Sequence, residues 1–198
     1  MCDFKPDAPM KILAFCGSLR EKSLNRMALD AMTLRAPVGV EITIFDQLEY
    51  LPFFNPDIEL AIEEKRMTSS ELSQDTIQLL SKLKSDLAAS DALIISSPEY
   101  AHGVTGLITL DWLVSGESFV NLPVMLVNTS ARATHAQASL LEIVKTMSAN
   151  VIEETNLTLP LLGSQITSSS QLLETDLVAQ IDASLILFCD NVLALKSS

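Results

Sequence analysis

The stretch ILAFCGSLREKSLN, residues 12–25, decides the fold that we predict for this chain. Its first four residues form an apolar run that is typical of a buried β-strand. A turn rich in hydroxyl groups follows, and from Leu24 to Met32 apolar residues recur at helical spacing. A strand that turns directly into a helix presents unpaired backbone N–H groups and a positive helix end to an anion. The stretch therefore predicts a phosphate site, most naturally for the phosphate of a nucleotide cofactor.

The same alternation of strand and helix continues along the chain. Further strands are predicted at residues 40–45, 92–96 and 123–128, with a weaker edge strand near 151–159. Apolar spacing predicts helices over residues 72–87, 136–147 and 177–192, and a short helix near 58–66. Thr134, with Gln137 three residues later, has the spacing of a capping box at the start of a helix.

This alternation predicts a parallel sheet that is covered by helices on both faces. Five strands favour an α/β fold, a flavodoxin-like three-layer sandwich with a five-stranded parallel sheet in the order 2-1-3-4-5. The 198 residues suit one domain with one core, so we expect a single domain over 1–198 in which residues 1–9 form a loose extension.

Composition excludes several classes of function. The net charge of −12 disfavours nucleic acid and anionic membranes as partners. No apolar run approaches the ~18 residues of a membrane span, and the first residues lack a secretory pattern, so we expect a cytoplasmic protein. Three scattered cysteines without a CxxC motif argue against a disulfide framework or a metal site, and we expect Cys16 and Cys189 to be buried structural thiols.

Three polar loops follow the predicted strands. They are GSLREKSLN (residues 17–25), SPEYAHGVTG (97–106) and TSARATHAQ (129–137). In the predicted topology, the loops at the carboxyl ends of the first, third and fourth strands share one crevice. We therefore expect these three segments to form one site.

Together with LPFFNPD (51–57) and LDWL (110–113), these loops resemble the NADPH-dependent FMN reductase family, which includes flavin, quinone and chromate reductases. The resemblance runs from about Lys11 to Asn150 and implies a non-covalently bound FMN. Its phosphate would be held by Ser18, Arg20, Ser23 and Asn25. The isoalloxazine ring would lie along Pro98, Glu99, Tyr100, Ala101, His102 and Gly103. The far side of the flavin would meet Thr129, Ser130, Ala131 and Arg132.

The chemistry of these residue types agrees with the roles that the resemblance implies. A phosphate is bound well by a helix N-terminus with several donors, and a planar ring by a flat side chain such as Tyr100 or His102. Backbone N–H groups near Ala131 and the charge of Arg132 would stabilise an anionic reduced flavin. For His102 and for His135, a hydrogen-bonding or capping role is the simpler interpretation. Trp112 suits the core or an interface better than a flavin stack, and Glu99 suits backbone positioning better than acid catalysis.

The resemblance implies an NAD(P)H-dependent oxidoreductase in which hydride from NADPH or NADH passes through flavin N5 to a quinone, a flavin or a metal ion. The cofactor carries this chemistry, so no catalytic residue and no resident metal are expected. A homodimer or homotetramer is implied as well. Two alternatives stay open: a flavin-binding electron carrier, and a degenerate relative without turnover. The second alternative arises because the Lys-Asn pair that the family often has before Thr109 is missing, and because Ala101 stands where asparagine is frequent.

Overall fold

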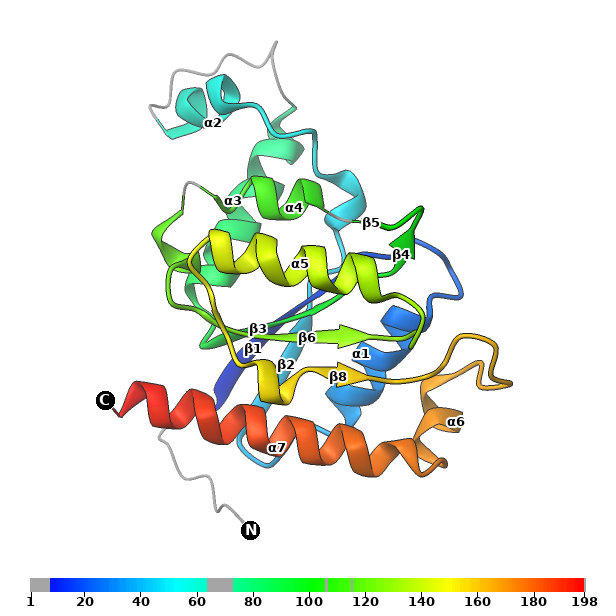
Figure 1. The fold of residues 1–198 in the computed structure, drawn as a ribbon. Coiled ribbons are helices and arrows are strands. Elements are labelled where there is room, and N and C mark those ends of the chain that lie inside the picture. Colours follow the sequence, from blue (N-terminus) through cyan, green and yellow to red (C-terminus); the bar gives the residue numbers. More distant parts are fainter. Residues whose placement is uncertain (1–7, 64–72, 106, 115, 198) are drawn as a thin grey trace.

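The chain folds as a sheet between two layers of helices (Figure 1). The structure is a computed structural model that describes residues 8–63, 73–105, 107–114 and 116–197. Helices α1 (Leu24–Leu34) and α7 (Leu177–Lys196) cover one face of the sheet. Helices α3 (Gln74–Ala88), α4 (Leu107–Asp111) and α5 (Thr134–Thr146) cover the other face. The predicted three-layer sandwich is therefore confirmed.

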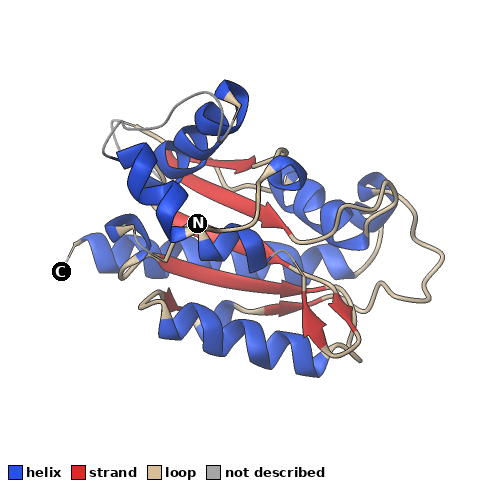
Figure 2. Ribbon diagram, turned by 90° about the horizontal axis from the view of Figure 1, so that it is seen from above, coloured by secondary structure: helices blue, strands red, loops and turns tan. Residues whose placement is uncertain are grey.

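All strands of the main sheet run parallel. Strands β1 (Met10–Cys16), β2 (Val40–Ile44), β3 (Ala92–Ser96) and β6 (Pro123–Asn128) lie in the order β2-β1-β3-β6. Figure 2 shows the arrows of the long strands pointing to the same end of the sheet, where the loops that follow them gather. The fifth position is shared by β7 (Asn150–Val151) and β8 (Leu157–Thr158), which both pair with β6. The predicted order 2-1-3-4-5 is confirmed, but the sheet has six strands instead of five.

The edge strand is split because a short 3₁₀ helix, Glu153–Thr155, interrupts it. At the interruption, Oδ1 of Asn156 accepts a hydrogen bond from the N–H of Leu126 at 2.8 Å. This side chain therefore replaces the backbone carbonyl that a continuous strand would have offered to β6. This interruption explains why the sequence pattern near residues 151–159 predicts a strand only weakly.

The side chains of β1 are buried on both faces of the sheet. Ile12 and Ala14 belong to the core that α1 and α7 share, whereas Leu13 and Phe15 belong to the core of α3 and α5. All four side chains are at most 3% exposed. From Ile12 to Cys16 the strand is apolar at every position, without alternation, because helices exclude water from both of its faces.

Serine side chains begin three of the described helices, among them α1 and α3. Oγ of Ser23 accepts from the N–H of Arg26, and Oγ of Ser73 accepts from the N–H of Thr76, both at 3.1 Å. These serines are the N-caps of α1 and α3. Leu72, the first residue of the helix predicted over residues 72–87, lies outside the described residues.

Helix α7 has a length and an apolar composition that would also suit a membrane span, alone among the helices of the described residues. The expectation that no segment has these properties is therefore wrong. Its side chains Ile181, Leu185, Phe188 and Val192 recur at helical spacing and are fully buried against the sheet. The core of the fold accounts for the apolar character of this face.

The long connection after β2 contains a 3₁₀ helix, Leu48–Tyr50, and helix α2 (Pro56–Glu63). The short helix predicted near residues 58–66 is thus found, although its last predicted residues lie outside the described part. Trp112 is 1% exposed, and its Nε1–H donates to the carbonyl of Pro52 at 2.8 Å. Phe54 packs edge-on against the indole with ring centroids 5.0 Å apart. Trp112 therefore belongs to the core, where it holds this connection against the domain.

Three further short elements complete the described fold. A 3₁₀ helix, Glu117–Phe119, precedes β6, and α6 (Ser169–Leu173) precedes α7. Strands β4 (Glu99–Tyr100) and β5 (Gly103–Val104) form a separate antiparallel pair after β3. This small hairpin carries part of the predicted site.

Candidate functional site

The turn after β1 is packed tightly against the loop after β3. The N–H of Gly17 donates to the carbonyl of Ser96 at 2.8 Å, and the hydroxyl of Thr105 donates to the carbonyl of Gly17 at 2.8 Å. A Cβ at position 17 would lie 2.8 Å from Oγ of Ser97 and 2.9 Å from the carbonyl oxygen of Thr105. Only glycine fits this contact, so the motif that follows it is held in a fixed position.

The start of α1 presents hydrogen-bond donors to the space above it. Ser23 satisfies the N–H groups of Arg26 and Met27, with its hydroxyl and its carbonyl respectively. Within the described residues, the N–H groups of Leu24 and Asn25 have no protein acceptor. The hydroxyl of Ser23 accepts from Arg26 and lies 3.9 Å from Sγ of Cys16, a contact in which either atom can donate. The local geometry is that of an anion site at a helix N-terminus.

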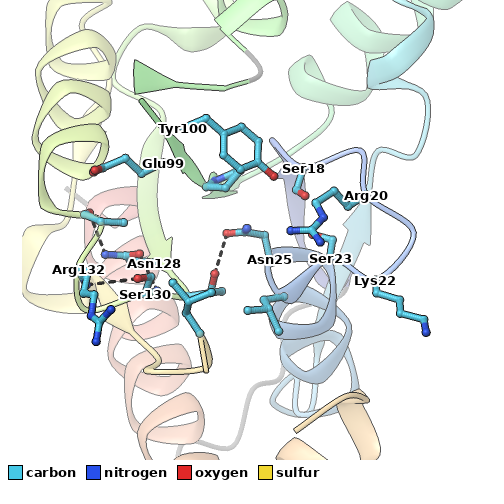
Figure 3. Close-up of a pocket in the computed structure, with 15 residues that line it drawn as sticks. Ser18, Arg20, Lys22, Ser23, Asn25, Glu99, Tyr100, Asn128, Ser130 and Arg132 are labelled. Atoms are coloured by element: carbon cyan, nitrogen blue, oxygen red, sulfur yellow. Dashed lines mark hydrogen bonds between the residues drawn. The ribbon is translucent and has the colours of Figure 1, made fainter. Parts of the chain in front are cut away.

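A buried asparagine joins the loops of three strands. Asn25 is 4% exposed, and its Oδ1 accepts from Oγ of Ser96 at 2.9 Å and from Oγ1 of Thr129 at 3.3 Å. These partners lie at the ends of β3 and β6, so the three loops meet at one side chain. Figure 3 labels Asn25 and draws one of these hydrogen bonds as a dashed line. The same amide carries an NH₂ group that lines the space between the loops.

The loop after β3 forms a two-residue hairpin turn. Ala101 and His102 have φ angles of 50° and 61°, in the left-handed region that most residues avoid. Positive φ at both central residues is the geometry of a type I′ turn, which usually has asparagine and glycine there. Tyr100 precedes the turn with a half-exposed ring. The turn therefore holds its backbone in a conformation that its residue types do not favour.

Glu99 connects this hairpin to α5. One carboxylate oxygen accepts from the N–H of Ala136 at 2.8 Å, and the other lies 3.0 Å from Nδ1 of His102. The hydrogen bond from Ala136, followed by the two nearby histidines, lowers the pKa of Glu99 below its ordinary value despite partial desolvation. Glu99 thus has the positioning role that was expected of it.

The capping box predicted at the start of α5 is wrong. Thr134 is the first helical residue, not the N-cap, and Ala133 occupies the cap position. The N–H of Ala136 in the first turn of α5 instead donates to the carboxylate of Glu99, which is distant in sequence. A tertiary contact has replaced the local motif.

The loop after β6 is folded on itself by short hydrogen bonds. Asn128 accepts from the N–H of Ser130 at 2.9 Å and donates to the carbonyl of Ala133 at 3.2 Å. The N–H of Arg132 donates to Oγ of Ser130 at 3.3 Å. This N–H is therefore already engaged within the loop. Arg132 itself is among the residues that line the site.

These loops enclose one pocket of about 260 Å³. Figure 3 shows side chains from the loops after β1, β3 and β6 directed into the space between them. Ten of the predicted residues line it: Ser18, Arg20, Ser23, Asn25, Pro98, Glu99, Tyr100, Thr129, Ser130 and Arg132. Four predicted residues do not: Ala101, His102, Gly103 and Ala131. Five lining residues were not predicted: Lys22, Leu24, Asn128, Ala133 and Leu162.

Some of the missed residues carried a usable signal. Lys22 and Leu24 lie inside the loop that was already predicted to bind phosphate, and Asn128 is the last residue of a predicted strand. Leu162 reaches the pocket because the N–H groups of Leu161 and Leu162 both donate to the carbonyl of Thr129 at 3.2 Å. Nothing in the local sequence around Leu162 indicates that long-range contact.

The charge of the pocket is opposite to that of the molecule. The chain has a net charge of −12, yet Arg20, Lys22 and Arg132 line this space. Among the lining residues the only acid is Glu99, whose two oxygens are held by Ala136 and His102. The site is therefore built for an anion.

The two cysteines in the described part of the chain do not line this pocket. Cys16 and Cys189 are buried free thiols, as expected, and burial raises the pKa of both, to about 12 for Cys189. A thiol that resists ionisation is a poor nucleophile.

Comparisons with known proteins agree with this architecture. The NADH:(hydroxy)cinnamate reductase subunit CrdA of Vibrio ruber is 23% identical over 181 residues, which are 87% of this chain and 82% of that protein. An NAD(P)H-dependent FMN reductase of Pseudomonas aeruginosa is 26% identical over 105 residues, covering 52% of this chain and 49% of the relative. A solved structure of FerB, a flavoenzyme NAD(P)H:(acceptor) oxidoreductase from Paracoccus denitrificans, superposes with a TM-score of 0.68 at 18% identity. That superposition covers 91% of this chain and 98% of FerB, and it supports the flavodoxin-like fold.

A family model described as NADPH-dependent FMN reductase matches residues 10–161. The match extends from β1 to the residues just after β8, and so it contains the three loops of the pocket. It confirms the resemblance that the loop motifs indicated. The chain belongs to the NADPH-dependent FMN reductase family.

Proposed function

We propose that the protein is an NAD(P)H-dependent oxidoreductase that binds FMN in the pocket between the loops after β1, β3 and β6. Family membership gives the class of reaction and the cofactor. The observation that carries the assignment to this pocket is its charge: three cationic residues and an unpaired helix start line it in a protein of net charge −12. A dianionic phosphate matches this set of donors.

The residues around the start of α1 fit the phosphate of FMN. Backbone N–H groups of Leu24 and Asn25, the hydroxyls of Ser18 and Ser23 and the amide of Asn25 supply neutral donors. Arg20 and Lys22 supply charge beside them. Because the Asn25 amide is already anchored by Ser96 and Thr129, it would bind the phosphate without reordering.

The opposite wall of the pocket fits the flavin ring. Pro98 and Tyr100 offer flat or compact surfaces, and Arg132 lies on the loop across the space. FMN, when bound, would take a hydride at N5 from NAD(P)H and pass the electrons to a small-molecule acceptor. The protein's part is to hold the ring, to keep Glu99 engaged with α5 so that its charge is balanced, and to supply positive charge through Arg132.

The test of this site compares FMN with riboflavin, which lacks the phosphate. Binding is followed by the quenching of flavin fluorescence. We expect FMN to bind about 100-fold more tightly than riboflavin, since charge-assisted hydrogen bonds contribute roughly 1.5–3 kcal/mol each. Arg20→Ala should weaken FMN about tenfold while riboflavin binding stays the same.

Lys11→Ala is the matched control, because Lys11 is exposed on β1 and lies at the end opposite to the pocket. It should change neither affinity. Equal affinities of the wild-type protein for FMN and riboflavin would rule out the proposed phosphate site.

The acidic surface favours a second candidate, a flavin-binding electron carrier. Mixing the FMN-loaded protein with NADPH in a stopped-flow instrument distinguishes the two. Direct bleaching of the flavin spectrum means a reductase, whereas bleaching that requires a partner protein means a carrier. If the protein does not bind flavin at all, it is a degenerate relative without turnover. Inserting Lys-Asn between Ile108 and Thr109 should then restore flavin binding.

A homodimer or homotetramer and a cytoplasmic location are also parts of this proposal. The support for association is exposed apolar surface: Phe53 is 81% exposed, and Val114 and Val120 are more than half exposed. Large apolar side chains that are exposed in a single protomer can be buried when two protomers associate. Light scattering on the purified protein would give the mass of the assembly.

A further inference from the structure

The two histidines of the chain lie against each other beside the pocket. His102 is in the hairpin turn after β4, and His135 is in the first turn of α5. Their ring centroids are 4.3 Å apart, with the rings nearly edge to face. Neither residue lines the pocket, but Glu99, which contacts His102, does. Two elements that are distant in sequence thus bring both imidazoles to the rim of the proposed flavin site.

Glu99 fixes the orientation of the His102 ring. Its Oε2 is held by the N–H of Ala136, and its Oε1 lies 3.0 Å from Nδ1 of His102. Because an ionised carboxylate only accepts hydrogen bonds, Nδ1 must carry a proton. In the neutral ring Nε2 is then the basic nitrogen, and in the protonated ring Nε2 carries the proton that can be given away.

The backbone of His102 is strained in a way that keeps this arrangement. Its φ of 61° follows the φ of 50° at Ala101, so two non-glycine residues share the left-handed region. Such strain persists only where surrounding contacts hold it, and it is concentrated at functional sites. Here the contacts are the carboxylate of Glu99 and the ring of His135.

Quinone reduction needs a proton donor in addition to the hydride. Reduction of a quinone to a hydroquinone consumes a hydride and one further proton. The hydride carries both electrons, so the remaining carbonyl oxygen must receive a proton from another source. The His102 side chain is 74% exposed, and it can therefore exchange protons with solvent between turnovers.

We propose that His102 is the proton donor to quinone-type acceptors and that Glu99 is the residue that positions it. The proton leaves Nε2 of the imidazolium and bonds to the acceptor oxygen, and the neutral imidazole then regains a proton from water. The titratable groups that face the ring are Glu99 from β4 and His135 from α5. This inference rests on the proposed function, since it adds a residue to the same site.

The first test needs no turnover. The ¹⁵N chemical shifts of the imidazole nitrogens show which nitrogen of a neutral ring carries the proton. With only two histidines in the chain, His135→Gln assigns the signals. We expect the proton of neutral His102 on Nδ1 in the wild-type protein, and a loss of this preference in Glu99→Ala. A proton on Nε2 in the wild-type protein would overturn the proposal, whether or not the variant folds.

The second test separates acceptors that need a proton from one that does not. FMN-loaded, reduced protein is mixed in a stopped-flow instrument with a benzoquinone or with ferricyanide, which takes an electron and no proton. General acid catalysis contributes typically about 10²–10⁴-fold. His102→Asn should therefore slow quinone reduction at least tenfold more than ferricyanide reduction, and should flatten its pH profile. Asparagine is chosen because it tolerates a positive φ.

His135→Gln is the matched control, because it removes the neighbouring imidazole without touching Glu99. It should produce a smaller difference between the two acceptors than His102→Asn does. Equal effects of His102→Asn on both acceptors would overturn the proton-donor role. If the wild-type protein is not reduced by NAD(P)H and reacts with neither acceptor, the proposed function itself has failed.

Discussion

At the scale of single residues, the site depends on backbone positions that few residue types can occupy. Gly17 is required because a Cβ would meet the backbone of Thr105 and the side chain of Ser97. Ala101 is the reverse case, since its φ of 50° belongs to glycine or asparagine, yet an alanine stands there. Gly17 is therefore needed for lack of space, whereas Ala101 is held in an unfavourable conformation by the surrounding hairpin.

Ala101→Gly should therefore stabilise the protein. The left-handed conformation costs an alanine roughly 1–2 kcal/mol, and the greater flexibility of unfolded glycine offsets part of the gain. We expect an increase of about 1 kcal/mol in the free energy of unfolding, measured by urea denaturation. Ala183→Gly is the control, because Ala183 is exposed within α7 and its φ is helical. The same substitution there should lower the stability by about 0.5–1 kcal/mol. A loss at both positions would contradict the strain at Ala101.

At the scale of elements, one carboxylate joins a hairpin to a helix. Glu99 accepts from the N–H of Ala136 at the start of α5, so the position of β4 depends on the helix and the helix depends on β4. A negative charge at a helix N-terminus is favourable, and this agrees with the lowered pKa of Glu99. Because the folded-state pKa is below the ordinary value, the stabilisation is present above the ordinary pKa and is lost as the pH falls through the lowered one.

Glu99→Gln should remove this pH dependence. At pH 7 the variant should melt at a lower temperature than the wild-type protein, because it lacks the charge at the start of α5. The difference should shrink as the pH falls below the ordinary pKa of a glutamate carboxyl group, since the wild-type side chain then becomes protonated as well. Thermal melts followed by circular dichroism between pH 7 and pH 3 measure both effects. A difference that is constant over this range would show that the charge is not responsible.

At the scale of the whole molecule, the predictable features were those that follow from the periodicity of apolar residues and from the order of strands and helices along the chain. The apolar runs of β1, β3 and β6 and the spacing in α1, α3 and α5 were sufficient for the sheet order and for the three loops at one edge. Contacts between distant segments were not predictable, because no local pattern encodes them. Asn156 completing the edge of β6, Glu99 capping α5 and Leu162 reaching the pocket are of this kind. Where local motifs and tertiary contacts competed, as at Thr134, the tertiary contact prevailed.

The role of α7 belongs to the same scale. Its composition would suit a membrane, but Phe188 is fully buried in the core while Leu187 is 41% exposed. Phe188→Ala should therefore lower the free energy of unfolding by about 3–5 kcal/mol, whereas Leu187→Ala should cost less than about 1 kcal/mol. Urea denaturation of the detergent-free protein measures both. Similar small losses would mean that α7 is not part of the core.

The hydrogen bonds of Asn25 have a consequence for how the protein would acquire and lose its cofactor. Because this one amide hydrogen-bonds to Ser96 and Thr129, the spacing of the three loops is fixed by contacts within the protein itself. When FMN dissociates, the apoprotein would stay folded, and its pocket could bind FMN again without rearrangement. The flavin would then be an exchangeable cofactor. The fraction of the protein that carries FMN in the cell would follow the concentration of free FMN.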